Sequence, residues 1–150
     1  SGDVDETIQE LEQVYSVLPK QLIHRDVHLG NFLFEGQAFS GYVDFDLSQS
    51  NIRIFDLCYF LLGILCEESK FGINTERWFD IVKQVIGGYH SILPLNQEEQ
   101  RSIACVMKSI ELLFVAYFLG IGDEKLAEDA GRLFYFVKKH ESRLKRIITT

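Results

Sequence analysis

Apolar side chains recur every three or four residues over most of the chain, a pattern that predicts a largely helical protein. The first helix is expected over Asp5 to Leu18, because Pro19 cannot continue it. Four more helices are expected in the last two thirds of the chain. Their predicted ranges are Asn51 to Glu67 with Ser50 or Asn51 as N-cap, Thr75 to Tyr89 with Thr75 as N-cap, Gln97 to Leu119, and Asp123 to Ile148.

Three short segments between the first two helices are rich in the residues that favour strands: Gln21 to His24, Phe32 to Gly36 and Phe39 to Phe45. The last two are expected to form a hairpin around Glu35-Gly36-Gln37. We find no repeat and no linker. The prediction is therefore one α+β domain over residues 1–150, mostly helical.

The last predicted helix carries a 4-3 spacing that could form either a helical bundle or a coiled-coil dimer. Because the pattern lasts only three heptads, we favour packing within a bundle. The residues of this seam are Leu126, Ala130, Leu133, Val137, His140, Leu144 and Ile147.

The overall charge limits the partners that the chain can have. The net charge is -7 with 47% hydrophobic residues, so the chain is globular and lacks the basic surface typical of nucleic-acid binding. The apolar runs Leu57 to Cys66 and Leu112 to Gly122 are each shorter than the roughly 20 residues that cross a bilayer. We expect neither a nucleic acid nor a membrane as partner.

The three cysteines form no C-x-x-C pair, which favours a reducing cytoplasmic location. Cys58, Cys66 and Cys105 lie in apolar helical runs, so each is expected to be buried. The acidic start is not a signal peptide, and it contains no initiator methionine. We therefore expect a piece of a longer protein, in which Ser1-Gly2 is either native or a remnant of cloning.

One stretch, HRDVHLGNFLFEGQAFSGYVDFD, places charged residues among strand-forming ones. Asp26 and Asn31 lie five residues apart in a loop, and Asp44 ends the second strand of the hairpin. If the hairpin folds back, these three side chains converge. A carboxylate and an amide oxygen, from Asp44 and Asn31, suit Mg²⁺, while Asp26 could accept a proton from a hydroxyl. Phosphoryl transfer requires mainly such positioning and charge neutralisation.

The same spacing occurs in protein kinases, where H-R-D precedes a metal-binding Asn by five residues and an Asp-Phe pair follows. The chain resembles more closely the C-terminal lobe of the aminoglycoside phosphotransferase and choline kinase group of small-molecule kinases. Their catalytic loop commonly reads H-x-D-x-H-x-x-N, which His24, Asp26, His28 and Asn31 fill. Asp44 follows the hydrophobic GYV, and Asp56 lies in FDLCYF at the start of a helix.

The resemblance implies a protein-kinase-like C-terminal lobe whose short hairpin carries the catalytic and metal loops. It implies ATP and Mg²⁺ as cofactors, with Asp26 as the catalytic residue and with Asn31 and Asp44 holding the metal on the nucleotide. Asp46 replaces the kinase glycine and is either a second metal ligand or a solvated carboxylate.

The remaining polar residues of the motif are expected to support the loop. His24 should be hydrogen-bonded inside and pack near Phe45, and the His28 ring should bond backbone or Asp56. Asp56 should brace the loop from its helix. A further set either lines an acceptor pocket or belongs to the core, and helical spacing favours the core: Trp78, Asp80, Tyr89, Glu111, Phe114 and Tyr117.

Two parts of a protein kinase are missing from the chain. The segment after Asp44 is too short to dock a peptide, so the expected acceptor is a hydroxyl of a small molecule. No glycine-rich phosphate loop is present, so a missing N-terminal lobe should bind the nucleotide and this chain alone should be inactive. The alternatives are a metal-dependent phosphohydrolase that uses Asp26, Asp44 and Asp46, or a non-catalytic kinase-like binding module.

Overall fold

The computed structural model describes residues 2–148, so Ser1 of the Ser1-Gly2 pair lies outside the described residues. Five α-helices, four strands and one 3-10 helix make up this part of the chain. They are α1 (Gly2–Tyr15), β1 (Lys20–Ile23), η1 (Leu29–Asn31), β2 (Phe32–Glu35), β3 (Ala38–Tyr42), β4 (Gln49–Ile52), α2 (Ile54–Ser69), α3 (Thr75–Ile92), α4 (Gln97–Gly120) and α5 (Glu124–Ile148). The predicted mostly helical α+β fold is confirmed.

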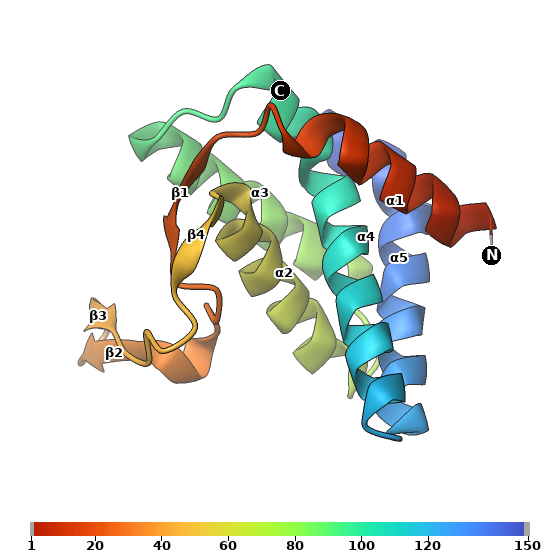
Figure 1. Cartoon of the computed structure of the whole chain (residues 1–150). Coiled ribbons are helices and arrows are strands. Elements are labelled where there is room, and N and C mark those ends of the chain that lie inside the picture. Colours follow the sequence, from red (N-terminus) through yellow and green to blue (C-terminus); the bar gives the residue numbers. More distant parts are fainter. Residues whose placement is uncertain (1, 149–150) are drawn as a thin grey trace.

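Helix α4 is the centre of the helical layer. It contacts α1, α2 and α5, and α5 runs back along it after a short turn (Figure 1). Large side chains from α3 and α4, including Trp78, Phe79 and Met107, fill the space between these helices with almost no exposed surface. Helix α5 therefore packs within a bundle, as predicted, and the apolar burial of this layer is the main source of stability.

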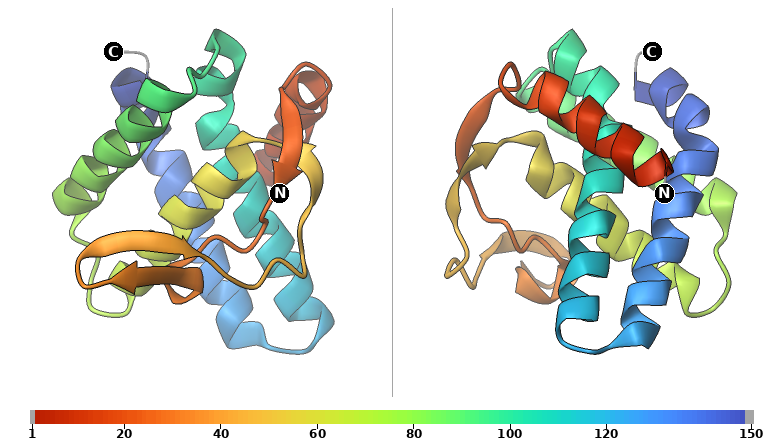
Figure 2. Two further views of the ribbon diagram at one scale, coloured as in Figure 1. Left: turned by 90° about the vertical axis from the view of Figure 1, so that its left-hand side faces the viewer. Right: turned by 45° about the vertical axis from the view of Figure 1, so that its right-hand side comes forward.

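The strands form two small antiparallel sheets. In one, β1 pairs with β4, with Lys20 opposite Ile52 and Ile23 opposite Gln49. In the other, β2 pairs with β3 as the predicted hairpin, with Phe32 opposite Tyr42. The hairpin projects from the helical layer and lies below β1 and β4 (Figures 1 and 2).

The hairpin does not pair with β1, because β4 occupies that place. The sequence of β4, Gln49–Ile52, lacks an apolar alternation, and its last three residues, 50–52, fall in the cap and start of the predicted helix. Asn51 accepts hydrogen bonds from the Tyr15 hydroxyl and from the Ile52 backbone, so it does not cap a helix. Helix α2 starts at Ile54. The residue before it, Arg53, donates two hydrogen bonds to the buried carboxylate of Glu99 on α4.

Other local predictions need smaller corrections. Helix α1 ends at Tyr15, three residues early, although Leu18 is still buried. Helix α3 is capped by Asn74 and not by Thr75, because the Asn74 side chain accepts a hydrogen bond from the Arg77 backbone. Cys58 and Cys105 are buried, as predicted, but Cys66 is exposed. Leu65, the residue before it, faces the core, so Cys66 lies on the outer face of α2.

By length and composition, α4 is the one helix in residues 2–148 that could cross a membrane, and 44% of its apolar window is buried inside the protein. The run Leu112 to Gly122, which we judged too short, is thus extended by the preceding turns of the same helix. Those turns are buried against other helices, as expected for a core helix, and α4 is not clear evidence of a membrane span.

Candidate active site

The loop that follows β1 is fixed by a carboxylate from helix α2. Asp56 lies in the first turn of α2 and accepts hydrogen bonds from the backbone N–H groups of His24 and Arg25, both at 2.8 Å. Arg25 has a φ of 73°, a left-handed conformation that is costly for a side chain of its size. The bonds to Asp56 hold the chain in this turn, which brings Asp26 back towards α2.

The carboxylate of Asp26 is held through both of its oxygens. Its Oδ1 accepts a hydrogen bond from the Tyr59 hydroxyl at 2.8 Å. Its Oδ2 accepts one from the Asn31 amide at 3.2 Å and lies 3.5 Å from Nε2 of His28. The Asp26 side chain remains 22% exposed, so a group from outside can still reach this carboxylate.

His24 connects the loop to the end of the hairpin. Its Nδ1 accepts a hydrogen bond from the Asp26 backbone, so its Nε2 carries the proton and donates to the carbonyl of Val43 at 2.8 Å. Its ring packs against Phe45 at 4.5 Å between centroids. These contacts are the ones predicted for His24, and they place the segment before Asp44 beside the loop.

His28 supports the loop through the backbone. Its Nδ1 accepts a hydrogen bond from the N–H of Gly30 at 3.1 Å and caps η1. A Cβ at position 30 would lie 2.8 Å from the His28 ring, so a larger residue there would displace the ring. Of the two partners expected for the His28 ring, the backbone is the one observed, and the oxygens of Asp56 accept the N–H groups of His24 and Arg25.

The two expected metal ligands are linked through the backbone. The N–H of Val43, next to Asp44, donates to the carbonyl of Asn31 at 3.0 Å. Asp44 itself is exposed and has a left-handed φ of 63°, a conformation that Asp tolerates better than most residues. Because the Asn31 nitrogen donates to Asp26, its amide oxygen is the atom that could bind a cation.

This donor set fits Mg²⁺, which takes one or two protein oxygens and completes its shell with water and phosphate oxygens. In the described part of the chain, no group of three or more His, Cys, Asp or Glu side chains is arranged to hold a metal. The three-carboxylate site of the hydrolase alternative, with Asp26, Asp44 and Asp46, is therefore not assembled. Asp46 is exposed, and its role as a ligand stays a prediction.

Tyr59 was not identified from the sequence, although it contacts the central carboxylate of the site. A signal was present: Tyr59 follows Asp56 by three residues on one helix, so the two side chains share a face. An aromatic residue in the apolar run LCYFLLGILC is typical of a core position, so the sequence alone predicts no role for Tyr59 in the site.

The residues considered for an acceptor pocket divide between core and surface. Trp78 is fully buried and donates from Nε1 to the Leu61 carbonyl, which confirms the core interpretation. Asp80 is exposed, and so is Tyr117 at 61%. Glu111 is buried between helices, and burial raises the pKa of its carboxyl to about 8. These residues do not assemble into one cavity around Asp26.

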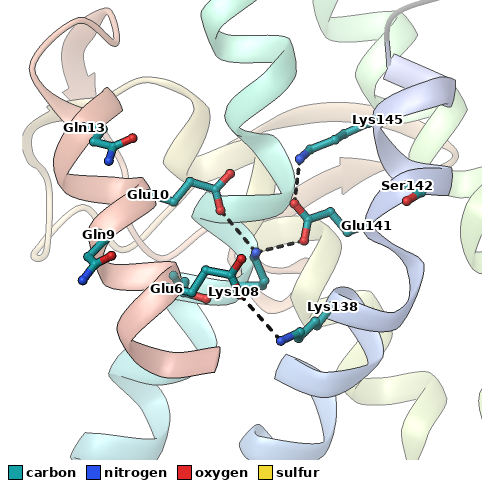
Figure 3. A pocket seen from close by; sticks show the side chains of 10 residues that line it. Glu6, Gln9, Glu10, Gln13, Lys108, Lys138, Glu141, Ser142 and Lys145 are labelled. Atoms are coloured by element: carbon teal, nitrogen blue, oxygen red, sulfur yellow. Dashed lines mark hydrogen bonds and ion pairs between the residues drawn. The ribbon is translucent and has the colours of Figure 1, made fainter. Parts of the chain in front are cut away.

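A cavity of about 460 Å³ lies elsewhere, between α1, α4 and α5. Figure 3 shows Lys108 of α4 at its base, between Glu10 of α1 and Glu141 of α5. Lys145 binds the other oxygen of Glu141 at 2.7 Å. The charged groups of this groove neutralise one another. We therefore interpret its ion pairs as structural.

The chain matches the phosphotransferase enzyme family over residues 2–92, a range that includes the whole site described above. The chain belongs to this family. Among its relatives are homoserine kinases of Zymomonas mobilis, 30% identical over 117 residues, and of Mesorhizobium japonicum, 27% identical over 116 residues. These alignments cover 74% and 77% of this chain.

A homoserine kinase of Brucella melitensis biotype 2 is 26% identical over 98 residues, which are 65% of this chain and 28% of that protein. The chain spans about a third of the length of the first two relatives, 34% and 35%. No solved structure matches the chain significantly. Membership of the family thus rests on the sequence match, and the geometry of the loop is compatible with phosphoryl transfer.

Proposed function

We propose that the chain is the C-terminal lobe of an ATP- and Mg²⁺-dependent kinase that phosphorylates a hydroxyl of a small molecule. The observation that supports this most directly is the arrangement around Asp26. A partly exposed carboxylate is fixed by Tyr59 and Asn31, and the chain leading to a second carboxylate, Asp44, is tied to the same loop.

In this proposal each residue has one task. Asp26 orients the acceptor hydroxyl and receives its proton as the hydroxyl oxygen attacks the γ-phosphorus of ATP, whose bond to the bridging oxygen breaks to release ADP. The amide oxygen of Asn31 and the carboxylate of Asp44 hold Mg²⁺, and Asp46 is an additional candidate. Bound Mg²⁺ would neutralise the charge of the nucleotide phosphates. Asp56, His24 and His28 keep the loop in shape, since they bond its backbone.

Two observations favour a small acceptor. Only nine residues, 45–53, separate Asp44 from helix α2, and part of them forms β4 with its partner β1. This leaves no long segment on which a peptide could dock. In addition, the relatives are named for homoserine, a small amino acid with a primary hydroxyl. Homoserine or a similar amino alcohol is therefore the first acceptor to test.

We further propose that an N-terminal lobe of the same protein covers the hairpin and binds the nucleotide. The hairpin exposes a set of apolar side chains that a solvated hairpin would not need: Leu33, Phe34, Phe39 and Tyr42 are each about half exposed. The matched segment covers only 34% and 35% of the first two relatives, which leaves length in them for such a lobe. ATP is abundant in the cytoplasm, and we propose that location.

The test uses the full-length protein with ATP, Mg²⁺ and a panel of amino alcohols that includes homoserine. We expect Asp26→Asn to lower kcat by about a thousandfold or more, because the residue that accepts the proton is lost. Its thermal midpoint should change by less than about 2 °C, because the side chain keeps its shape. The matched control is Asp5→Asn, an exposed position on α1.

Two results would contradict the proposal. An Asp26→Asn protein with wild-type kcat would remove Asp26 from the chemistry, and no phosphate transfer to any hydroxyl of the panel would argue against this acceptor class. Residues 1–150 alone should show no turnover. Normal turnover by this fragment would disprove the need for an N-terminal lobe.

A further inference from the structure

We propose that Tyr59 is a positioning residue that fixes the orientation of the Asp26 carboxylate for proton transfer. This inference rests on the proposed kinase function and concerns the same site. The Tyr59 hydroxyl donates to Oδ1 of Asp26 at 2.8 Å, while Asn31 donates to Oδ2 at 3.2 Å. With one donor on each oxygen, the carboxylate cannot rotate about its Cβ–Cγ bond without breaking a hydrogen bond.

The two donors come from different elements of the structure, η1 and α2. Asn31 belongs to the same loop as Asp26 and is a candidate metal ligand, whereas Tyr59 belongs to α2 and bonds the other oxygen. The contact from Tyr59 is thus independent of the residues that would hold Mg²⁺. It can aim the remaining lone pairs of Asp26 towards an acceptor hydroxyl in every state of the metal site.

Tyr59 is itself held in place, as a positioning residue must be. Its ring is half-buried between Phe55, stacked at 6.0 Å on the same helix, and Phe114 of α4 at 6.1 Å. Burial raises the pKa of the Tyr59 hydroxyl, and the hydrogen bond and charge of Asp26 raise it further. The phenol therefore stays neutral and remains a donor to the carboxylate.

Helix α2 controls both the backbone and the side chain of the proposed base. Asp56 binds the N–H groups of His24 and Arg25, and Tyr59, one turn later, binds the carboxylate of Asp26. A rigid helix that contacts three consecutive residues can hold Asp26 more closely than the loop could alone. An error of about 1 Å in such a position costs up to about a hundredfold in rate.

The test is Tyr59→Phe in the full-length kinase, which removes one oxygen and keeps the ring between Phe55 and Phe114. We expect kcat to fall about tenfold or more while KM for the acceptor stays within about twofold, since orientation and not binding is lost. The thermal midpoint should stay within about 2 °C of the wild type. Tyr15→Phe is the matched control, because its hydroxyl also donates at 2.8 Å, to Asn51 of β4.

A double variant separates this role from a structural one. If Tyr59 acts through Asp26, Tyr59→Phe should change the residual rate of the Asp26→Asn protein by less than about twofold. An equal fall in both backgrounds, or a fall of the thermal midpoint in proportion to the rate, would show a structural role and overturn the proposal.

Two further outcomes would also overturn it: an unchanged kcat in Tyr59→Phe, and a rise in KM at constant kcat, which would make Tyr59 a substrate contact. Failure of the kinase function itself is read from a different variant. It appears as full activity of Asp26→Asn or as absence of transfer in the wild type, whatever Tyr59→Phe does.

Discussion

The loop around Asp26 and the groove around Lys108 are both polar clusters built on one charged side chain, yet they differ in how that charge is satisfied. Lys108 is only 5% exposed and lies between two carboxylates, Glu141 at 2.9 Å and Glu10 at 3.3 Å. Asp26 is 22% exposed, and its two closest donors, Tyr59 and Asn31, are neutral. The groove thus contains compensated charges, and the loop contains a carboxylate that its closest hydrogen-bond donors orient without neutralising.

This difference distinguishes a structural site from a chemical one better than the size of a cavity does. Burial disfavours the charged ammonium of Lys108, but the hydrogen bonds and charges of Glu141 and Glu10 outweigh this and raise the pKa of Lys108. Its proton is therefore not available for chemistry. Asp26 keeps an accessible carboxylate whose two hydrogen-bond donors are neutral, which is what a general base needs.

The largest stability effect is expected in the groove. Lys108→Met should lower the free energy of unfolding by about 3 kcal/mol, because Glu10 and Glu141 would then face each other without the cation that both contact. Denaturant unfolding of the chain measures this. In the full-length protein, kcat for the proposed reaction at a temperature below the unfolding transition should stay at the wild-type level.

Lys125→Met is the control for this variant, because Lys125 is exposed on α5 and its loss should cost little. The contrast between the two regions would fail if Lys108→Met lowered kcat while the protein remained folded. In that case the groove would have to take part in the reaction or in binding the acceptor.

Asp56→Asn, which weakens the support of the loop, is expected to lower the unfolding free energy less than Lys108→Met does and to lower kcat as well. One charge-assisted acceptor for the N–H groups of His24 and Arg25 is replaced by a donor, at a cost of about 1–2 kcal/mol in unfolding free energy. Because Asp26 follows directly, kcat should also fall about tenfold. Lys108→Met is the comparison: a similar or greater loss of stability there should leave the rate unchanged.

The sequence located the polar residues of the loop and the Asp56 that holds it, but not strand β4, which pairs with the strand before the loop. Asp26, Asn31 and Asp44 follow a spacing that chemistry imposes, and the Val43 backbone indeed connects the neighbourhood of Asp44 to Asn31 and His24. Strand β4 was missed because three of its four residues, 49–51, are polar and the strand carries no periodic pattern. Its place depends on pairing with β1, a contact between segments about 30 residues apart.

Tyr59 shows a second limit of sequence reasoning. Its apolar neighbours make it indistinguishable from a core aromatic residue, and only the turn at Arg25 brings Asp26 within 2.8 Å of its hydroxyl. The N-cap of α3 could not be chosen from the sequence for a related reason. Asn74 and Thr75 are both good caps, and the choice between them depends on which backbone the side chain reaches.

Glu111 extends the comparison, because it is a buried acid for which we find no ion pair among the described residues. Burial raises the pKa of its carboxyl from 4.5 to about 8. Below pH 4.5 the group is protonated in both the folded and the unfolded protein. As the pH rises from about 4.5 to about 8, the unfolded state ionises first and the folded state loses stability.

Glu111→Gln removes this titration and should therefore stabilise the protein in a pH-dependent way. We expect no difference near pH 4 and a gain of about 2 kcal/mol in unfolding free energy near pH 8, less than the full shift implies because the site can relax. Denaturant unfolding at both pH values measures it, with the exposed Glu128→Gln on α5 as control. A gain that is equal at pH 4 and pH 8 would mean that Glu111 does not titrate in this range, and the buried acid would then be compensated as fully as Lys108 is.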